Sequence, residues 1–459
     1  MKRLFTLCLL LVVALAGCNL GMTDDAGPAT IQPRPQITDQ PLPTLGYSTQ
    51  IPQVGGTPAP TPISQISGAQ LYTLLNQVTA NSLLNTITTL QNFKTRHVNS
   101  TQSSATEGIG AAANWLYGEF LKIQDQSRGN LQAFTHPFRA TFNGQTTDQR
   151  NIVGIINGTL PNTPAIVIGA HYDSRTDDLT DATGVAPGAD DNGSGVAAVL
   201  EMAHVLSQLR PRSTIILVLF SAEEVDRQGS KAFVRDYIRF YNIPVRVMIN
   251  IDTVGSTNDR FGNVNDRELR IFSAGPDTSP SRDMARMIDF ITDNHSTDLK
   301  LIFVEDIDRE GRFGDHFSFS EAGIPAVRII EALEDNVNRE GRDWVQYVEP
   351  EYLRKSVRTL TTMVLALADG LPYPETVVLR DNDDGTRRLV WERVEGATGY
   401  VVALRFPNDV TFEQQFPSSP EITVYDCDCF TADRYRSIAV AAINENGIMG
   451  PLSPEVVVP

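Results

Sequence analysis

The chain has 459 residues, enough for two or three domains, and its 41% apolar and 20% charged residues are typical of a globular protein with a sizeable core. Its 55 acidic residues outnumber the 38 basic ones and give a formal net charge of −17. Because such a surface repels phosphate backbones, we expect no nucleic-acid partner. Four cysteines are too few for a disulfide-stapled scaffold, and one apolar run excludes a multi-span membrane protein.

The first 17 residues have the composition of an export signal. Lys2 and Arg3 precede a short apolar run that ends in small residues just before Cys18. This pattern resembles the lipobox of bacterial lipoproteins, which implies removal of residues 1–17 and acylation of the Cys18 sulfur. An ordinary signal peptide with an incidental cysteine is the alternative. We therefore predict an extracytoplasmic protein that its lipid anchors to a bacterial membrane, at the cell surface or in the periplasm.

Residues 18–67 are rich in Pro, Thr, Gly and Gln. Such a segment buries too little apolar surface to offset the entropy lost on ordering. We predict a disordered stalk that holds the folded part of the chain away from the membrane.

Residues 68–372 alternate helical and strand patterns. Apolar residues recur at helical spacing in 71–90, 109–120, 196–209, 230–241, 281–292, 318–322 and 351–368. Short β-branched runs indicate strands at 151–156, 165–170, 214–220, 245–251, 269–272, 301–304 and 326–330. This alternation predicts an α/β domain in which helices sandwich a mostly parallel mixed sheet.

Residues 373–459 have a different pattern, with short alternating strands at 376–380, 388–391, 399–404 and 437–442 separated by turn residues. We expect a small all-β sandwich. Leu389-Val390-Trp391, Gly396 to Tyr400 and the alternation at 435–442 resemble a fibronectin type III domain. Such a domain is a possible module for surface or substrate docking. Cys427 and Cys429 could pair or remain thiols, and we assign them no function.

Polar residues gather where the predicted strands of the α/β domain end. His171, Glu223 with Glu224, and Asp252 each follow an apolar run, and two loops add Asp190 and His316. Carboxyl ends of parallel strands lie at one edge of a sheet, and charges gathered there without partners would be costly. Divalent cations remove that cost. Imidazole and carboxylate ligands with open positions are typical of catalytic zinc, and a bridging carboxylate can hold two metals.

These residues carry a specific resemblance over about residues 68–370. The motifs, in order, are His171-x-Asp173, Gly188-Ala189-Asp190-Asp191-Asn192, Glu223-Glu224, Asp252 and Asp315-His316. They resemble the dizinc aminopeptidase family, which includes bacterial leucyl aminopeptidases, glutamate carboxypeptidase and the transferrin receptor. The resemblance implies a peptide hydrolase with two zinc ions that removes N-terminal residues through a metal-activated water.

The same resemblance implies a role for each residue. Asp190 is expected to bridge the two metals, with a cis bond between Asp190 and Asp191. The remaining expected ligands are Glu224 and His316 for one zinc, and His171 and Asp252 for the other. Glu223 is the expected general base and acid, and Asp173 is expected to orient His171.

Three other functions remain as alternatives, whereas the length of one gap argues against a related peptidase family. A related peptidase family inserts a lid domain between the fourth and fifth ligands, but the 64 positions from Asp252 to His316 are too few for it. A glutaminyl-cyclase-like enzyme keeps one zinc, and a non-catalytic binding protein would lack ligands or the base. A carboxypeptidase would need a cation for the free carboxylate, which Arg309, Arg312 or Arg328 could supply, although surface or salt-bridging arginines are the simpler interpretation.

Overall fold

The computed structural model describes residues 68–296, 298–309, 312–334 and 342–459. The predicted signal (1–17), the predicted stalk (18–67) and Cys18 lie outside the described residues. Among the helices of the described part, none combines the length and the apolar character needed to cross a membrane.

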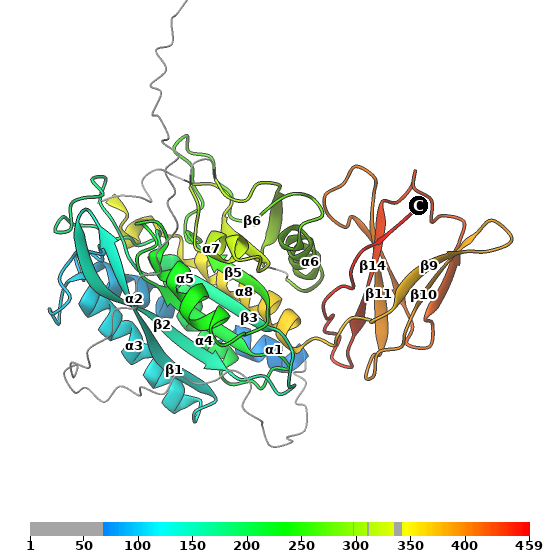
Figure 1. The fold of residues 1–459 in the computed structure, drawn as a ribbon, viewed down its shortest axis with the longest axis horizontal. Helices are drawn as coiled ribbons and strands as arrows, with labels where there is room; N and C mark the ends of the chain where they lie inside the picture. Colours follow the sequence, from blue (N-terminus) through cyan, green and yellow to red (C-terminus); the bar gives the residue numbers. More distant parts are fainter. Residues whose placement is uncertain (1–67, 297, 310–311, 335–341) are drawn as a thin grey trace, which may run out of the picture. The chain divides into compact units, whose positions relative to one another are not determined.

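An eight-stranded mixed sheet forms the centre of the α/β part (Figure 1), in the order β1-β2-β4-β3-β5-β8-β6-β7. Its strands are β1 (Leu131–Phe142), β2 (Gln145–Ile156), β3 (Ala165–His171), β4 (Ile215–Phe220), β5 (Val245–Ile251), β6 (Glu268–Ser273), β7 (Lys300–Val304) and β8 (Ala326–Glu331). The four central neighbours β4, β3, β5 and β8 are parallel, and β1, β2 and β6 introduce antiparallel pairs. Every residue of β3, β4 and β8 is buried, because helices cover both faces.

The helices belong to two layers. One group consists of α1 (Gly68–Leu75), α2 (Ala80–Gln91), α3 (Gly108–Gln126), α4 (Gly193–Leu206), α6 (Pro280–His295) and α8 (Pro350–Asp369), in which α4 and α8 pack on β3. The other group consists of α5 (Gln228–Phe233), the π-helical turn η1 (Val234–Arg239) and α7 (His316–Glu321). Phe233 and Tyr237 of this second group pack against Val167 of β3 and Val218 of β4. The predicted sandwich is therefore confirmed.

The strand β1 was not predicted, and β2 begins earlier than the pattern at 151–156 indicated. The two strands form a long hairpin around Asn143 and Gly144, whose φ angles of 46° and 72° suit a tight two-residue turn. Pro137 fits within β1 because this strand is at the edge of the sheet. The Asn-Gly pair between alternating segments was a usable signal for this hairpin.

The C-terminal region contains two small antiparallel sheets, as predicted. One has the order β13-β10-β9 and the other β12-β11-β14-β15. Their strands are β9 (Val377–Asp381), β10 (Arg387–Trp391), β11 (Gly399–Arg405), β12 (Gln414–Ser418), β13 (Val424–Cys427), β14 (Ser437–Ile443) and β15 (Val456–Val457). Before this region, a 3-10 turn, η4 (Val345–Tyr347), precedes α8 of the α/β part. Trp391 and Tyr400 pack edge to face, with ring centroids 5.5 Å apart, in the hydrophobic core that the two sheets share. Cys427 is disulfide-bonded to Cys429. The fibronectin type III resemblance stays a prediction.

Candidate functional site

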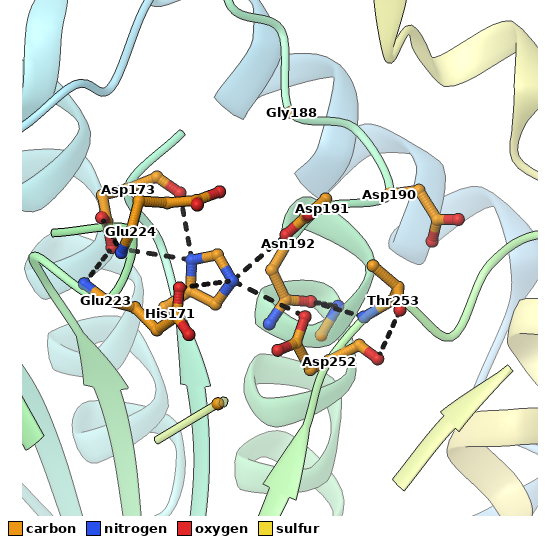
Figure 2. A network of polar contacts seen from close by, with 12 residues as sticks. His171, Asp173, Gly188, Asp190, Asp191, Asn192, Glu223, Glu224, Asp252 and Thr253 are labelled. Carbon is orange, nitrogen blue, oxygen red and sulfur yellow. Dashed lines mark hydrogen bonds and ion pairs between the residues drawn. The ribbon is translucent and has the colours of Figure 1, made fainter. Parts of the chain in front are cut away.

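Three neighbouring parallel strands bring their carboxyl ends to one place. β3 ends at His171, β4 leads into Glu223 and Glu224, and β5 leads into Asp252. Figure 2 shows that these side chains converge above the strand ends, where sites of open parallel sheets gather. The structure therefore brings together most of the residues that the sequence predicted.

The imidazole of His171 lies at the centre of this cluster. Its Nε2 atom is 3.2 Å from Asp191 Oδ1, 3.6 Å from Asp252 Oδ1 and 3.9 Å from Glu223 Oε2. Ligand atoms of His171, Asp191 and Asp252 all lie within 4.8 Å of one another, as do those of His171, Glu223 and Glu224. Both groups have the residue types and the spacing of a metal site.

Asp173 lies on the other side of the His171 ring and acts as a brace. The backbone carbonyl oxygen of Asp173 lies 3.2 Å from Nδ1 of His171, and its Oδ1 lies 3.6 Å from the same atom. Its carboxylate accepts the backbone N–H groups of Glu223 and Glu224, each at 3.1 Å. One buried residue therefore orients the histidine ring and also fixes the backbone of the loop that follows β4. This position suits the predicted role of Asp173.

Asp191, and not Asp190, points its carboxylate into the cluster (Figure 2). The predicted cis bond between Asp190 and Asp191 is wrong, because the cis bond joins Asp191 to Asn192. Asn192 caps α4, accepting the N–H of Gly195 through its side chain. Asp191 therefore has the place in the cluster that the resemblance implied for Asp190.

The carboxyl group of Asp190 turns away from His171. Its Oδ1 accepts the backbone N–H of Gly255 at 2.9 Å, and the carboxyl is hydrogen-bonded to that of Glu331. Burial raises the pKa of Asp190 to about 6, while burial and Asp190 raise the pKa of Glu331 further above its usual range. Glu331 keeps the proton and donates it to Asp190, which satisfies both buried groups without a metal.

His316 begins α7 and is completely buried, but its ring belongs to neither close group of ligand atoms. Its Nε2 lies 2.7 Å from the carbonyl oxygen of Ile307 and 3.7 Å from Asp308 Oδ2, while Nδ1 has no hydrogen-bond partner among the described residues. Burial lowers the pKa of His316 to about 4, so the ring is neutral and able to coordinate a metal. Its place among the ligands stays a prediction.

Arg328 is a buried ion-pairing residue and does not line the cavity at this site. Its guanidinium lies 3.0 Å from Asp252 Oδ2 and also pairs with Asp308. Burial alone would raise the pKa of Asp252, but Arg328 and His171 hold it well below its usual range. Arg328 therefore keeps Asp252 ionised and oriented.

Burial by itself raises the pKa of the two glutamates and lowers the pKa of the histidine. Burial raises the pKa of Glu223 well above its usual range and that of Glu224 to about 7. Burial alone would lower the pKa of His171, but Glu223 and the aspartates around it raise it well above 6.5. The carboxyl groups of this buried cluster therefore ionise readily only where positive charge lies nearby.

The donor set fits divalent cations. Asp252 Oδ1 and His316 Nδ1 are buried polar atoms without a hydrogen bond in the described part of the chain, which is costly unless a ligand engages them. Imidazole nitrogens together with carboxylate oxygens are the usual ligands of catalytic zinc. The residues present therefore suit zinc.

A cavity of about 400 Å³ opens beside the cluster. His171, Asp191, Glu223, Glu224 and Asp252 line it together with Arg175, Leu179, Asp226, Arg227, Arg309, Arg312 and Phe313. Arg175 donates from Nε to Glu224 Oε2 at 2.7 Å. Sequence reasoning missed Arg175, Arg227 and Asp191. For Arg227, its position four residues after Glu223 was a usable signal.

Comparisons with known proteins agree with this geometry. The sequence model described as peptidase family M28 matches residues 151–364. A "Probable zinc metalloprotease" of Leptosphaeria maculans is 31% identical over 360 residues, covering 70% of this chain and 82% of the relative. One of Pyrenophora tritici-repentis is 29% identical over 374 residues, covering 73% and 85%.

Solved structures share the fold. The LapA aminopeptidase of Legionella pneumophila has a TM-score of 0.53 and 22% identity, covering 71% of this chain and 79% of LapA. LapB of the same organism has a TM-score of 0.54 and 19% identity, covering 66% and 76%. With its cluster of zinc-type ligands, the chain belongs to peptidase family M28 and is a zinc-dependent metallopeptidase.

Proposed function

We propose that this metallopeptidase is an extracytoplasmic exopeptidase with two zinc ions, and most simply an aminopeptidase. The observation that carries the proposal is the convergence of two groups of ligand atoms on His171, one with Asp191 and Asp252 and one with Glu223 and Glu224. One histidine with four carboxylates exceeds what a single tetrahedral zinc needs.

Each residue of the cluster has a separate task. Asp191 would bridge the ions, with Glu224 and His316 completing one site, and His171 and Asp252 completing the other. Zinc held there would lower the pKa of a water molecule and polarise the scissile carbonyl. Glu223 would accept the proton of the attacking water and deliver it to the leaving amine, acting as base and then as acid. Asp173 holds His171 and the Glu223 backbone in place.

The cavity favours an exopeptidase. Its volume of about 400 Å³ is in the range of small-molecule pockets, which suits the end of a peptide. LapA, with which the chain shares its fold, is named an aminopeptidase. The arginines of the cavity wall support carboxypeptidase action as a second candidate.

The test combines metal content with hydrolysis of aminoacyl anilides, N-blocked peptides and C-terminally amidated peptides. We expect about two zinc ions per chain and cleavage that requires a free amino end. Chelation should abolish cleavage, and added zinc should restore it. Cleavage of N-blocked peptides that needs a free carboxyl end would replace the aminopeptidase by a carboxypeptidase. Metal-free protein with full activity would contradict both.

The proposed location rests on the charged start and the small residues before Cys18. In a bacterial host, the wild-type chain should fractionate with membranes and the Cys18→Ala variant should not. Equal membrane association of the two would contradict the lipid anchor. We further propose the C-terminal sheets as a docking module, which is supported by their resemblance to fibronectin type III domains.

A further inference from the structure

Four arginines line the cavity of this strongly acidic chain. Two of them already have close acidic partners: Arg175 pairs with Glu224, and Arg309 pairs with Glu334. The other two, Arg227 and Arg312, come from loops that lie far apart in the sequence and face the same cavity. Each of these two keeps a buried Nη1 atom without a hydrogen-bond partner among the described residues, whereas in Arg309 the unpartnered atom is Nε, which lies 3.7 Å from Asp308.

Arg227 is held in place by its surroundings while one donor stays unused. Its side chain is 11% exposed, and its guanidinium lies 4.7 Å from the ring centroid of Phe317 and 5.9 Å from that of Phe313. Nη2 donates to the exposed carboxylate of Asp226 at 3.1 Å. Nη1 is buried and has no hydrogen-bond partner among the described residues. A buried charged donor without a partner is unfavourable, so an anionic ligand at this position would stabilise it.

Arg312 repeats this pattern from the loop after β7. Its Nη1 is also buried and without a hydrogen-bond partner in the described ranges. Its Nη2 lies 3.7 Å from Asp191 Oδ2, which is an ion-pair distance beyond hydrogen-bond range. Both arginines therefore line the cavity and keep an N–H group that no described residue accepts.

Arg227 is also close to the reacting centre along the backbone. The backbone N–H of Arg227 donates to the carbonyl oxygen of Glu223 at 2.8 Å, and this hydrogen bond closes a turn from Glu223 to Arg227. Asp226 and Arg227 in this turn, and Ala222 just before it, have positive φ angles of 72°, 55° and 62°, so three non-glycine residues here adopt the left-handed region. The surrounding structure maintains a strained loop that places Arg227 on the cavity wall.

The charges of the cavity support an anion rather than a cation. The proposed ligands and base account for every carboxylate of the lining except Asp226, whose side chain is 70% exposed and also pairs with Lys231 at 2.7 Å. If zinc ions neutralise the cluster, the arginines give the remaining wall a positive charge.

We propose that Arg227 and Arg312 form a carboxylate-binding subsite, so that the preferred substrates carry a carboxylate next to the scissile bond. The inference rests on the proposed peptidase function and names its substrate class. The carboxylate has two possible sources: the terminal carboxylate of a dipeptide, or the side chain of an Asp or Glu residue. In either case the planar guanidinium recognises it by charge-assisted hydrogen bonds.

The test compares acid and amide pairs with the zinc-loaded full chain. Leu-Leu against Leu-Leu-amide reports the terminal carboxylate, and Glu-anilide against Gln-anilide reports the side chain. We expect kcat/KM to favour the acid in at least one pair, and Arg227→Gln to reduce that preference about tenfold or more. Arg227→Lys should retain part of it. Arg139→Gln, on an exposed side chain of β1, is the matched control and should leave the preference unchanged.

A binding measurement gives a readout that needs no turnover. In the Glu223→Gln background, calorimetry should show tighter binding of the acid than of the amide, and adding Arg227→Gln or Arg312→Gln should remove the difference. Zinc content is measured for each variant, since Arg312 lies near Asp191. Equal affinities for acid and amide, or a preference that both arginine substitutions leave intact, would overturn the subsite. Loss of hydrolysis on all substrates, including neutral anilides, would instead count against the proposed function.

Discussion

Asp343 accepts the backbone N–H groups of both Asp190, at 2.9 Å, and Asp191, at 2.7 Å. The N–H of Ala189 also donates to the carbonyl oxygen of Asp343, at 3.1 Å. One buried residue far along the chain therefore holds the turn that presents the proposed bridging ligand. Burial and the nearby Asp190 raise the pKa of Asp343 well above its usual range.

Substituting Asp343→Ala should loosen this turn. It leaves two buried N–H groups without an acceptor, which should reduce the free energy of unfolding by about 1–3 kcal/mol. We also expect weaker zinc retention, because Asp191 loses its backbone support. Urea unfolding and metal analysis after dialysis test both effects. Asp148→Ala on exposed β2 is the control, and matching behaviour of the two variants would refute the role of Asp343.

Asp190 and Asp191 should respond differently to the same substitution. Asp191→Asn removes a carboxylate 3.2 Å from His171 Nε2, so zinc content should fall. Asp190→Asn alters a group that already has Gly255 and Glu331 as partners, so zinc content should stay near that of the wild type. Inductively coupled plasma mass spectrometry of purified variants measures this. Greater zinc loss in Asp190→Asn would restore Asp190 as the bridging residue.

Glu223→Gln should abolish hydrolysis while leaving zinc content unchanged. The amide cannot accept the proton of the attacking water, and loss of a general acid–base typically costs about 10²–10⁴-fold in rate. Steady-state kcat with parallel metal analysis checks the prediction, and Glu119→Gln, on the outer surface of α3, is the control. Wild-type kcat in Glu223→Gln would assign the proton transfer to another residue.

Asp289 on α6 should make stability depend on pH. Burial, helped by Asp293, raises its pKa from 3.8 to about 7. Between these values the unfolded chain has lost this proton and the folded chain keeps it, so its contribution to stability falls as pH rises from about 4 to about 7. The slope is at most about 1.4 kcal/mol per pH unit.

Asp289→Asn should therefore reduce the change in the free energy of unfolding between pH 5 and pH 8. Compared with the wild type, the variant should gain more stability at pH 8 than at pH 5. Urea denaturation at both pH values measures this, with Asp148→Asn as the exposed control. An unchanged difference between pH 5 and pH 8 in Asp289→Asn would show that Asp289 ionises freely in the folded state.

Local patterns predicted much of the fold. The β-branched runs that became β3, β4, β5 and β8 are largely buried on both faces, and such strands are recognisable because most of their positions are apolar. The edge strand β1 was missed, since its polar alternation and Pro137 do not look like a buried strand. Its identity depends on pairing with β2, which is a tertiary contact along the whole hairpin.

By itself, the sequence determined the metallopeptidase chemistry, because the donors His171, Glu223, Glu224 and Asp252 follow apolar strands directly and parallel strands end together. Only the tertiary structure decided which of two adjacent aspartates faces His171. That choice follows from Asp343, 152 positions from Asp191, and from Glu331 of β8, which engages Asp190. Side-chain direction in a turn depends on partners that adjacent residues do not encode. The same holds for Arg328, which pairs with the buried Asp252, and for Arg227, which lines the cavity.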